Sequence, residues 1–237
     1  MAEAILGKKV LKEFISKRSW NTQKLLDDQK VFQKWANALN GKWASTKETE
    51  LTSPFYNQVL IDILGYEEGP SQKYTIAYEN STKSSAQKPD VILGDFSEGR
   101  HSQPDALIEF ESPYTPLDAH NVGVEQAFSY QSQYIKSVRW IIASNFRETR
   151  IYDSTREHVE VFKIEELAKN VSEIKRFIFF LSKQSIVKSL DKQGKTLENA
   201  VANNVADQKE ISDKFYEDYL QTRNKLLENI KNNNGRF

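Results

Sequence analysis

Apolar residues at three- and four-residue spacing predict helices in the first quarter of the chain. Residues 5–17 and 22–39 have this spacing, and the second segment follows Asn21, a residue type that caps helix N-termini. Residues 51–64 repeat the spacing and stop at Gly65, a common helix terminator. The sequence therefore predicts three N-terminal helices.

Alternating and short apolar runs predict β-strands from residue 74 onward. Each run is bounded by Gly, Pro, Ser or Asn. The runs are residues 74–80, 89–96, 106–112, 139–144, 150–152 and 157–163, and helical spacing returns between them at 120–135. Helices, a strand meander, a crossover helix and further strands are typical of an α/β fold with a mixed β-sheet flanked by helices.

The last third of the chain has helical patterns without strands. Residues 171–181 form an apolar helical segment, and residues 194–229 form a long, charged and weakly amphipathic one. The long segment is either a solvated helix packed on the sheet or a connector to another domain, and the polar end at 231–237 favours the connector. We therefore divide the chain into a sheet domain, 1–165, and a helical connector, 166–237.

Composition excludes several kinds of site. The 237 residues include no cysteine, so disulfides, thiol nucleophiles and cysteine-ligated metals are excluded. His101, His120 and His158 are too widely spaced to suggest a histidine-ligated zinc. Lys and Arg together number 33, as do Asp and Glu together, so the net charge is zero and neither indicates nor argues against a nucleic-acid partner. Without a membrane-length apolar run or a secretory signal, we expect a cytoplasmic protein with no membrane partner.

Carboxylates on two adjacent predicted strands are the most informative feature. Side chains alternate along a strand, so Glu109 and Glu111 share one face. Asp90 opens the preceding strand, and a hairpin would bring the three acidic groups together. Like charges at close range need a cation or bound protons, and Mg²⁺ is the simple solution. Alternatively, Asp90 caps a turn and both glutamates lie on the solvent face of an edge strand.

Several motifs in order carry a resemblance to a known family. The motifs are Pro89-Asp90, the E-x-E of Glu109 and Glu111, the helical segment 125–130, and the strand and turn at 140–152. Together they resemble the PD-(D/E)xK nuclease superfamily. More narrowly, they resemble the N-terminal endonuclease domain of bifunctional type IIG restriction-modification enzymes, whose chains continue into an adenine-N6 DNA methyltransferase. The resemblance runs from about residue 47 to 152.

The resemblance implies a restriction-endonuclease-like fold and a metal-dependent reaction on DNA. Mg²⁺, or Mn²⁺ in its place, would be held by Asp90, Glu109 and the carbonyl of Phe110. Glu48 matches an acidic residue beside the metal site in some members, or is an ordinary anionic residue near a helix N-terminus. The substrate would be double-stranded DNA, with a transient dimer as one route to double-strand cleavage. S-adenosylmethionine would belong only to the missing methyltransferase part.

Four further residues are candidates around this site. Gln126 and Tyr130 lie four apart on one helical face and can both point at the acidic cluster. Alternatively, Tyr130 is a core residue and Gln126 is a buried amide satisfied by backbone. Lys88 and Arg147 are candidates for contacts with the DNA backbone, although such residues equally form a solvated rim.

Glu111 departs from the family pattern, because the usual residue at this place is lysine. A glutamate can act as a general base or an extra metal ligand, but it supplies no positive charge. We therefore predict a metal-dependent endonuclease domain that uses Asp90, Glu109 and Glu111. The alternatives are a catalytically silent nuclease-fold module for DNA binding or assembly, and a helical scaffold with an accidental acidic patch.

Overall fold

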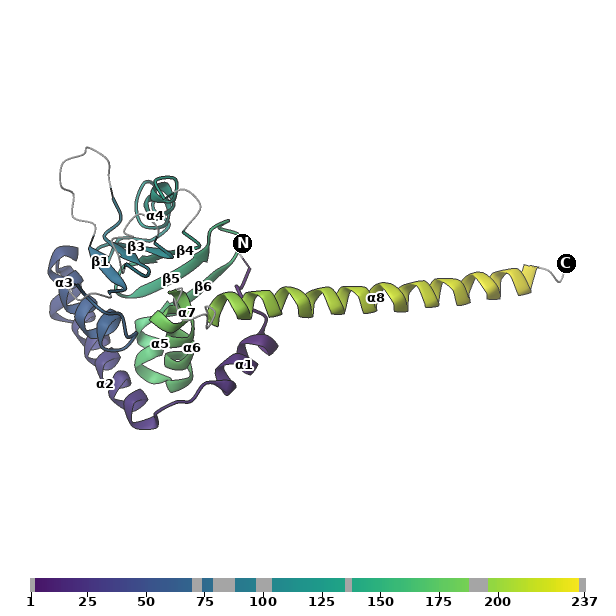
Figure 1. The fold of residues 1–237 in the computed structure, drawn as a ribbon, viewed down its shortest axis with the longest axis horizontal. Helices are drawn as coiled ribbons and strands as arrows, with labels where there is room; N and C mark the ends of the chain where they lie inside the picture. The colour runs from purple at the N-terminus through teal and green to yellow at the C-terminus, as the bar shows by residue number, and fades with distance from the viewer. Residues whose placement is uncertain are drawn as a thin grey trace.

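A six-stranded mixed sheet forms the centre of the described part of the chain (Figure 1). The structure is a computed structural model that describes residues 3–69, 74–78, 88–96, 104–134, 138–187 and 196–234. The strands lie in chain order: β1 (Ile76–Tyr78), β2 (Val91–Leu93), β3 (Ala106–Phe110), β4 (Trp140–Ser144), β5 (Glu148–Asp153) and β6 (Val159–Lys163). Strands β3 and β4 are parallel and the other neighbours are antiparallel, with helix α4 (Val124–Gln131) in the crossover. The predicted α/β fold is confirmed.

Helices cover both faces of the sheet. One face carries α1 (Lys8–Lys17), α2 (Thr22–Leu39), α3 (Glu48–Phe55), α5 (Ile164–Lys169), α6 (Val171–Leu181) and the short η1 (Lys42–Ser45) and α7 (Lys183–Ile186). The other face carries α4. Alternation along β3 divides its side chains accordingly: Ala106, Ile108 and Phe110 join the large helical core, while Leu107 joins the smaller core under α4.

The predicted helices 22–39 and 171–181 are confirmed residue for residue as α2 and α6. The predicted helix 51–64 differs, because it begins at Glu48 and passes after Phe55 into a π-helical turn, Tyr56–Ile61. Pro54 lies just before this change and has no N–H to continue the α-helical ladder. Downstream backbone N–H groups then bond five residues back, as from Leu64 to Val59.

The long helix α8 (Thr196–Asn234) begins on the body and then leaves it (Figure 1). Its first turns bury Leu197 and Ala200, and Asn204 Oδ1 accepts a 2.8 Å hydrogen bond from the Gly7 N–H. From residue 208 to 231 the side chains are exposed, apart from the half-buried Leu220. The division at 165/166 stays a prediction, and α6 shares the core of the sheet.

Two residues named in the sequence analysis cannot be compared with the structure. His101 and Gly194 lie outside the described residues. In the parts that the structure describes, no helix has the length and apolar character needed to cross a membrane.

Candidate active site

The pairing of β2 with β3 brings Asp90 beside Glu109. Val91 lies opposite Ile108 in this antiparallel pair, so the residue before β2 reaches the level of Glu109. Asp90 Oδ2 accepts a 2.7 Å hydrogen bond from the backbone N–H of Phe110. Strand β3 lies between β2 and β4, and Glu109 is only 4% exposed. The alternative of glutamates on the wet face of an edge strand is therefore wrong, because β3 is central.

Glu109 is a buried carboxyl group with an unsatisfied oxygen. Its Oε2 is buried and has no hydrogen-bond partner among the residues that the structure describes. Burial raises the pKa of Glu109 to about 9, and the charges of Asp90, Glu111 and Glu48 add to this shift against a hydrogen bond from the Asp90 backbone. Without a cation, Glu109 therefore holds a proton at neutral pH.

Glu48 and Asp90 belong to the same electrostatic cluster. Burial, followed by the charges of Asp90 and Glu111, raises the pKa of the half-buried Glu48 to about 7. Burial and the Glu111 charge also raise the pKa of Asp90, against the hydrogen bond from Phe110. Glu48 is the first residue of α3 and also a member of this cluster, while its place beside a metal stays a prediction. We call Glu48, Asp90, Glu109 and Glu111 the carboxylate cluster.

Glu111 has a partner that the sequence did not reveal. Its Oε1 accepts a 2.8 Å hydrogen bond from the N–H of Gly123, the N-cap of α4. Gly123 has a φ of +54°, and a Cβ there would lie 2.8 Å from the Leu117 carbonyl oxygen. Only glycine fits this position without strain. The positive end of α4 favours a carboxylate at 111. The predicted helical segment 120–135 includes Gly123, whereas α4 begins only at Val124, so residue spacing did not reveal this contact.

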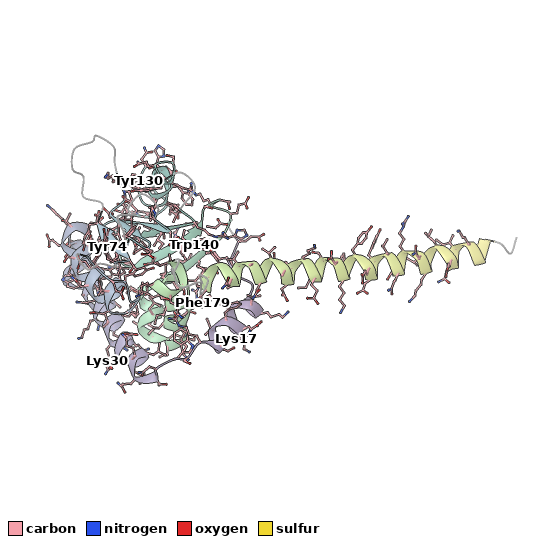
Figure 2. All side chains as sticks on the ribbon, in the orientation of Figure 1. Lys17, Lys30, Tyr74, Tyr130, Trp140 and Phe179 are labelled. Atoms are coloured by element: carbon pink, nitrogen blue, oxygen red, sulfur yellow. The ribbon has the colours of Figure 1, made fainter. Side chains whose placement is uncertain are left out.

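Gln126 and Tyr130 interact with each other beside the cluster. Gln126 Nε2 donates a 2.7 Å hydrogen bond to the Tyr130 hydroxyl, rather than being satisfied by backbone. Tyr130, labelled in Figure 2, is 2% exposed and packs in the core under α4. Burial raises the pKa of Tyr130, and the charges of Glu109, Asp90 and Glu111 act in the same direction against the Gln126 hydrogen bond. Tyr130 is thus a core residue that also lies within the field of the carboxylate cluster.

Arg147 and Lys88 have different surroundings. Arg147 donates hydrogen bonds to the Leu39 carbonyl and, at 3.0 Å, to Asn40 Oδ1, which ties the end of α2 to the turn after β4. The Tyr114 ring lies 5.3 Å from its guanidinium group. Lys88 is half-buried two residues before Asp90. Contact of either residue with DNA stays a prediction.

The donor set fits a hard divalent cation. Mg²⁺ prefers oxygen ligands and usually takes one or two carboxylates, together with water and phosphate oxygens. Asp90 and Glu109 supply two carboxylates, and Glu109 Oε2 has no competing hydrogen bond. Among the described residues, no three Asp, Glu or His side chains are already arranged to hold a metal together. The residues therefore fit a two-carboxylate site, while Phe110 and Glu48 stay predicted ligands.

A mixed six-stranded sheet flanked by helices, with carboxylates at the adjoining ends of β2 and β3, defines a restriction-endonuclease-like α/β protein. Residues 26–213 match the family model described as MmeI, N-terminal domain. The chain therefore belongs to this family, whose namesake is a type IIG restriction-modification enzyme, and the predicted resemblance is confirmed. The searches found no matching curated protein and no matching solved structure.

Proposed function

We propose that this chain is a DNA-cleaving domain of a restriction-modification enzyme and hydrolyses phosphodiester bonds with a divalent cation. The observation that carries the proposal is Glu109, a buried carboxyl group with an unpartnered oxygen inside a cluster of four. Such a group costs stability unless a cation or proton compensates it. The family of the chain, a domain of restriction enzymes, makes DNA the natural substrate.

Each residue has a defined part in the proposed reaction. A bound Mg²⁺ or Mn²⁺ supplies charge stabilisation to the phosphate and lowers the pKa of a coordinated water. Asp90 and Glu109 would hold the ion, with Glu109 ionised in the loaded site. Glu111, oriented by the Gly123 N–H, would accept the proton of the attacking water while the P–O bond to the leaving sugar oxygen breaks and that oxygen takes a proton from solvent; Glu111 supplies no positive charge, so this reaction would be slow. Gln126 holds the Tyr130 hydroxyl by a hydrogen bond, close enough to the carboxylates of Glu109, Asp90 and Glu111 for their charges to act on it. Lys88 contacts the DNA phosphates.

A second candidate is a catalytically silent module that binds DNA or assembles the enzyme. Glu111 favours it, because this residue stands where the superfamily usually has lysine and its Oε1 is already engaged by Gly123. Losing one electrostatic group that stabilises a transition state commonly costs about 100- to 1000-fold in rate. The two candidates differ in DNA cleavage and not in fold.

Calorimetric titration of Mn²⁺ and Mg²⁺ into the protein tests the metal site. We expect the native chain to bind and Asp90→Ala to lose binding, because the variant removes one of the two carboxylate ligands. Asp213→Ala, which removes an exposed carboxylate on α8, is the matched control and should bind as the native chain does. No binding by the native chain, or equal binding by Asp90→Ala, would contradict the site. Nicking of supercoiled plasmid DNA by the metal-loaded protein then separates the active domain from the silent module.

A further inference from the structure

The projecting part of α8 carries large exposed apolar side chains that no described element covers. We call residues 208–231 the arm. Figure 2 shows its side chains extending into open space, away from the body. Seven large apolar side chains of the arm are between 43% and 73% exposed: Ile211, Phe215, Tyr216, Tyr219, Leu226, Leu227 and Ile230. Monomeric proteins rarely expose so many apolar side chains on one element.

These side chains gather on one side of the helix. With about 3.6 residues per turn, all seven fall within one half of the helix circumference. The five acidic side chains of the arm fall in the other half; they are Glu210, Asp213, Glu217, Asp218 and Glu228. The arm therefore has an apolar face, which also holds Arg223 and, at its edge, Lys209, and a charged face; no described element covers the apolar one.

Charge along the arm is segregated into two halves. Residues 208–218 contain four acidic and two basic side chains, whereas residues 219–231 contain one acidic and three basic ones. Two arms packed antiparallel would place each acidic half against a basic half. Two arms packed parallel would place like against like, which electrostatics disfavours. The charge pattern thus selects an antiparallel partner with the same sequence, related by a two-fold axis near the middle of the arm.

The apolar face is large enough for a stable helix pair. Side chains of this size that expose about half of their surface contribute on the order of 100 Å² each, so covering all seven on both copies buries roughly 1,400 Å². Specific interfaces between proteins bury about 1,200 to 2,000 Å² in total. A second copy of the arm is therefore a sufficient occupant of the face.

We propose that two copies of this chain associate through their arms as an antiparallel helix pair. The surface lies apart from the carboxylate cluster, so the inference does not depend on the proposed function. Each apolar face covers the other, and the acidic half of one arm neutralises the basic half of its partner.

Sedimentation equilibrium of the full chain tests the association. We expect a concentration-dependent dimer for the native chain and at least tenfold weaker association for Phe215→Glu/Leu226→Glu, because the variant buries charges in the apolar contact. Gln221→Ala is the control, since residue 221 lies on the charged face and the substitution changes no charge, so this variant should dimerise as the native chain does. Circular dichroism checks that the arm stays helical in each variant. A native chain that is monomeric at every concentration, or a double variant that dimerises equally well, overturns the proposal.

Spin-label distances test the direction of the pair. The chain has no cysteine, so Asn229→Cys introduces a single labelling site near the far end of the arm. At a rise of about 1.5 Å per residue, an antiparallel pair centred on the arm holds the two labels roughly 30 Å apart. A parallel pair holds them near the interhelical spacing of about 10 Å. The longer distance is expected, and the shorter one overturns the antiparallel arrangement.

Discussion

Replacing Glu109 by glutamine should change how the stability of the fold depends on pH. The pKa of Glu109 is about 9 in the folded chain, compared with an ordinary value of 4.5. Between these values the folded state keeps a proton that the unfolded state has lost. Raising the pH through this range therefore lowers the free energy of unfolding. Glutamine has the same size and cannot ionise, so Glu109→Gln removes this dependence.

The size of the effect follows from one proton. A difference of one bound proton changes the free energy of unfolding by about 1.4 kcal/mol per pH unit. Between pH 5 and pH 8, the native chain should therefore lose on the order of 4 kcal/mol relative to Glu109→Gln. The loss stops above pH 9, where Glu109 is ionised in both states. Glu48, with a pKa of about 7 and a half-exposed side chain, leaves a smaller slope in the variant.

Urea unfolding at pH 5, 6, 7 and 8 in the presence of a chelator measures this difference. Glu166→Gln, which changes an exposed residue of α5, is the control and should follow the native curve. The free energies of unfolding of the native chain and Glu109→Gln should be equal near pH 5 and should differ more and more as the pH rises, with the native chain the less stable. Parallel curves would refute the reasoning, because they would show that Glu109 binds no extra proton in the folded state.

Two further predictions concern the neighbouring positions. Gly123→Ala should destabilise the fold by roughly 2 to 3 kcal/mol and Gly65→Ala by about 1 kcal/mol, since both have positive φ but a Cβ only at Gly123 meets backbone. Urea unfolding compares them, and equal losses would contradict the contact with Leu117. In a plasmid-nicking assay with Mg²⁺, the native chain should cleave weakly or not at all and Glu111→Lys should nick measurably faster, because lysine restores the missing positive charge. Glu111→Gln, which keeps an acceptor for the Gly123 N–H, is the control; strong native cleavage that Glu111→Lys abolishes would contradict the prediction, because it would show that Glu111 is an efficient base without a positive charge beside it.

Local sequence patterns predicted most helices and strands, and they predicted that Asp90 and Glu109 lie together. Alternation along β3 placed Glu109 and Glu111 on one face, and the pairing of β2 with β3, two strands consecutive in the sequence, brought Asp90 beside Glu109. Helix α5 was missed, because six residues are too few to show a period. The π-helical turn Tyr56–Ile61 was missed because the spacing of apolar residues does not distinguish bonds four residues back from bonds five residues back.

Long-range contacts could not be predicted. The bond between Glu111 and Gly123 requires the connection before α4 to return to the end of β3, and nothing in residue spacing specifies that return. Likewise, the bond from Arg147 to Leu39 joins residues 108 positions apart. Both contacts are set by how α2 and α4 pack on the sheet. These contacts determine whether the side chains of Glu111 and Arg147 are hydrogen-bonded within the protein or free to contact a substrate.

The distribution of aromatic residues separates the body from the arm spectroscopically. All four tryptophans, Trp20, Trp35, Trp43 and Trp140, precede α8, whereas the arm contributes many helical peptide groups and no indole. Tryptophan fluorescence therefore reports unfolding of the body alone, while far-ultraviolet circular dichroism also registers melting of the arm. The described contacts of α8 with the body lie in the first turns of the helix, before most of the arm. The fluorescence and circular dichroism signals therefore need not change together. A single unfolding midpoint would then depend on the probe chosen, and only the circular dichroism signal would shift with protein concentration if arms melt as pairs.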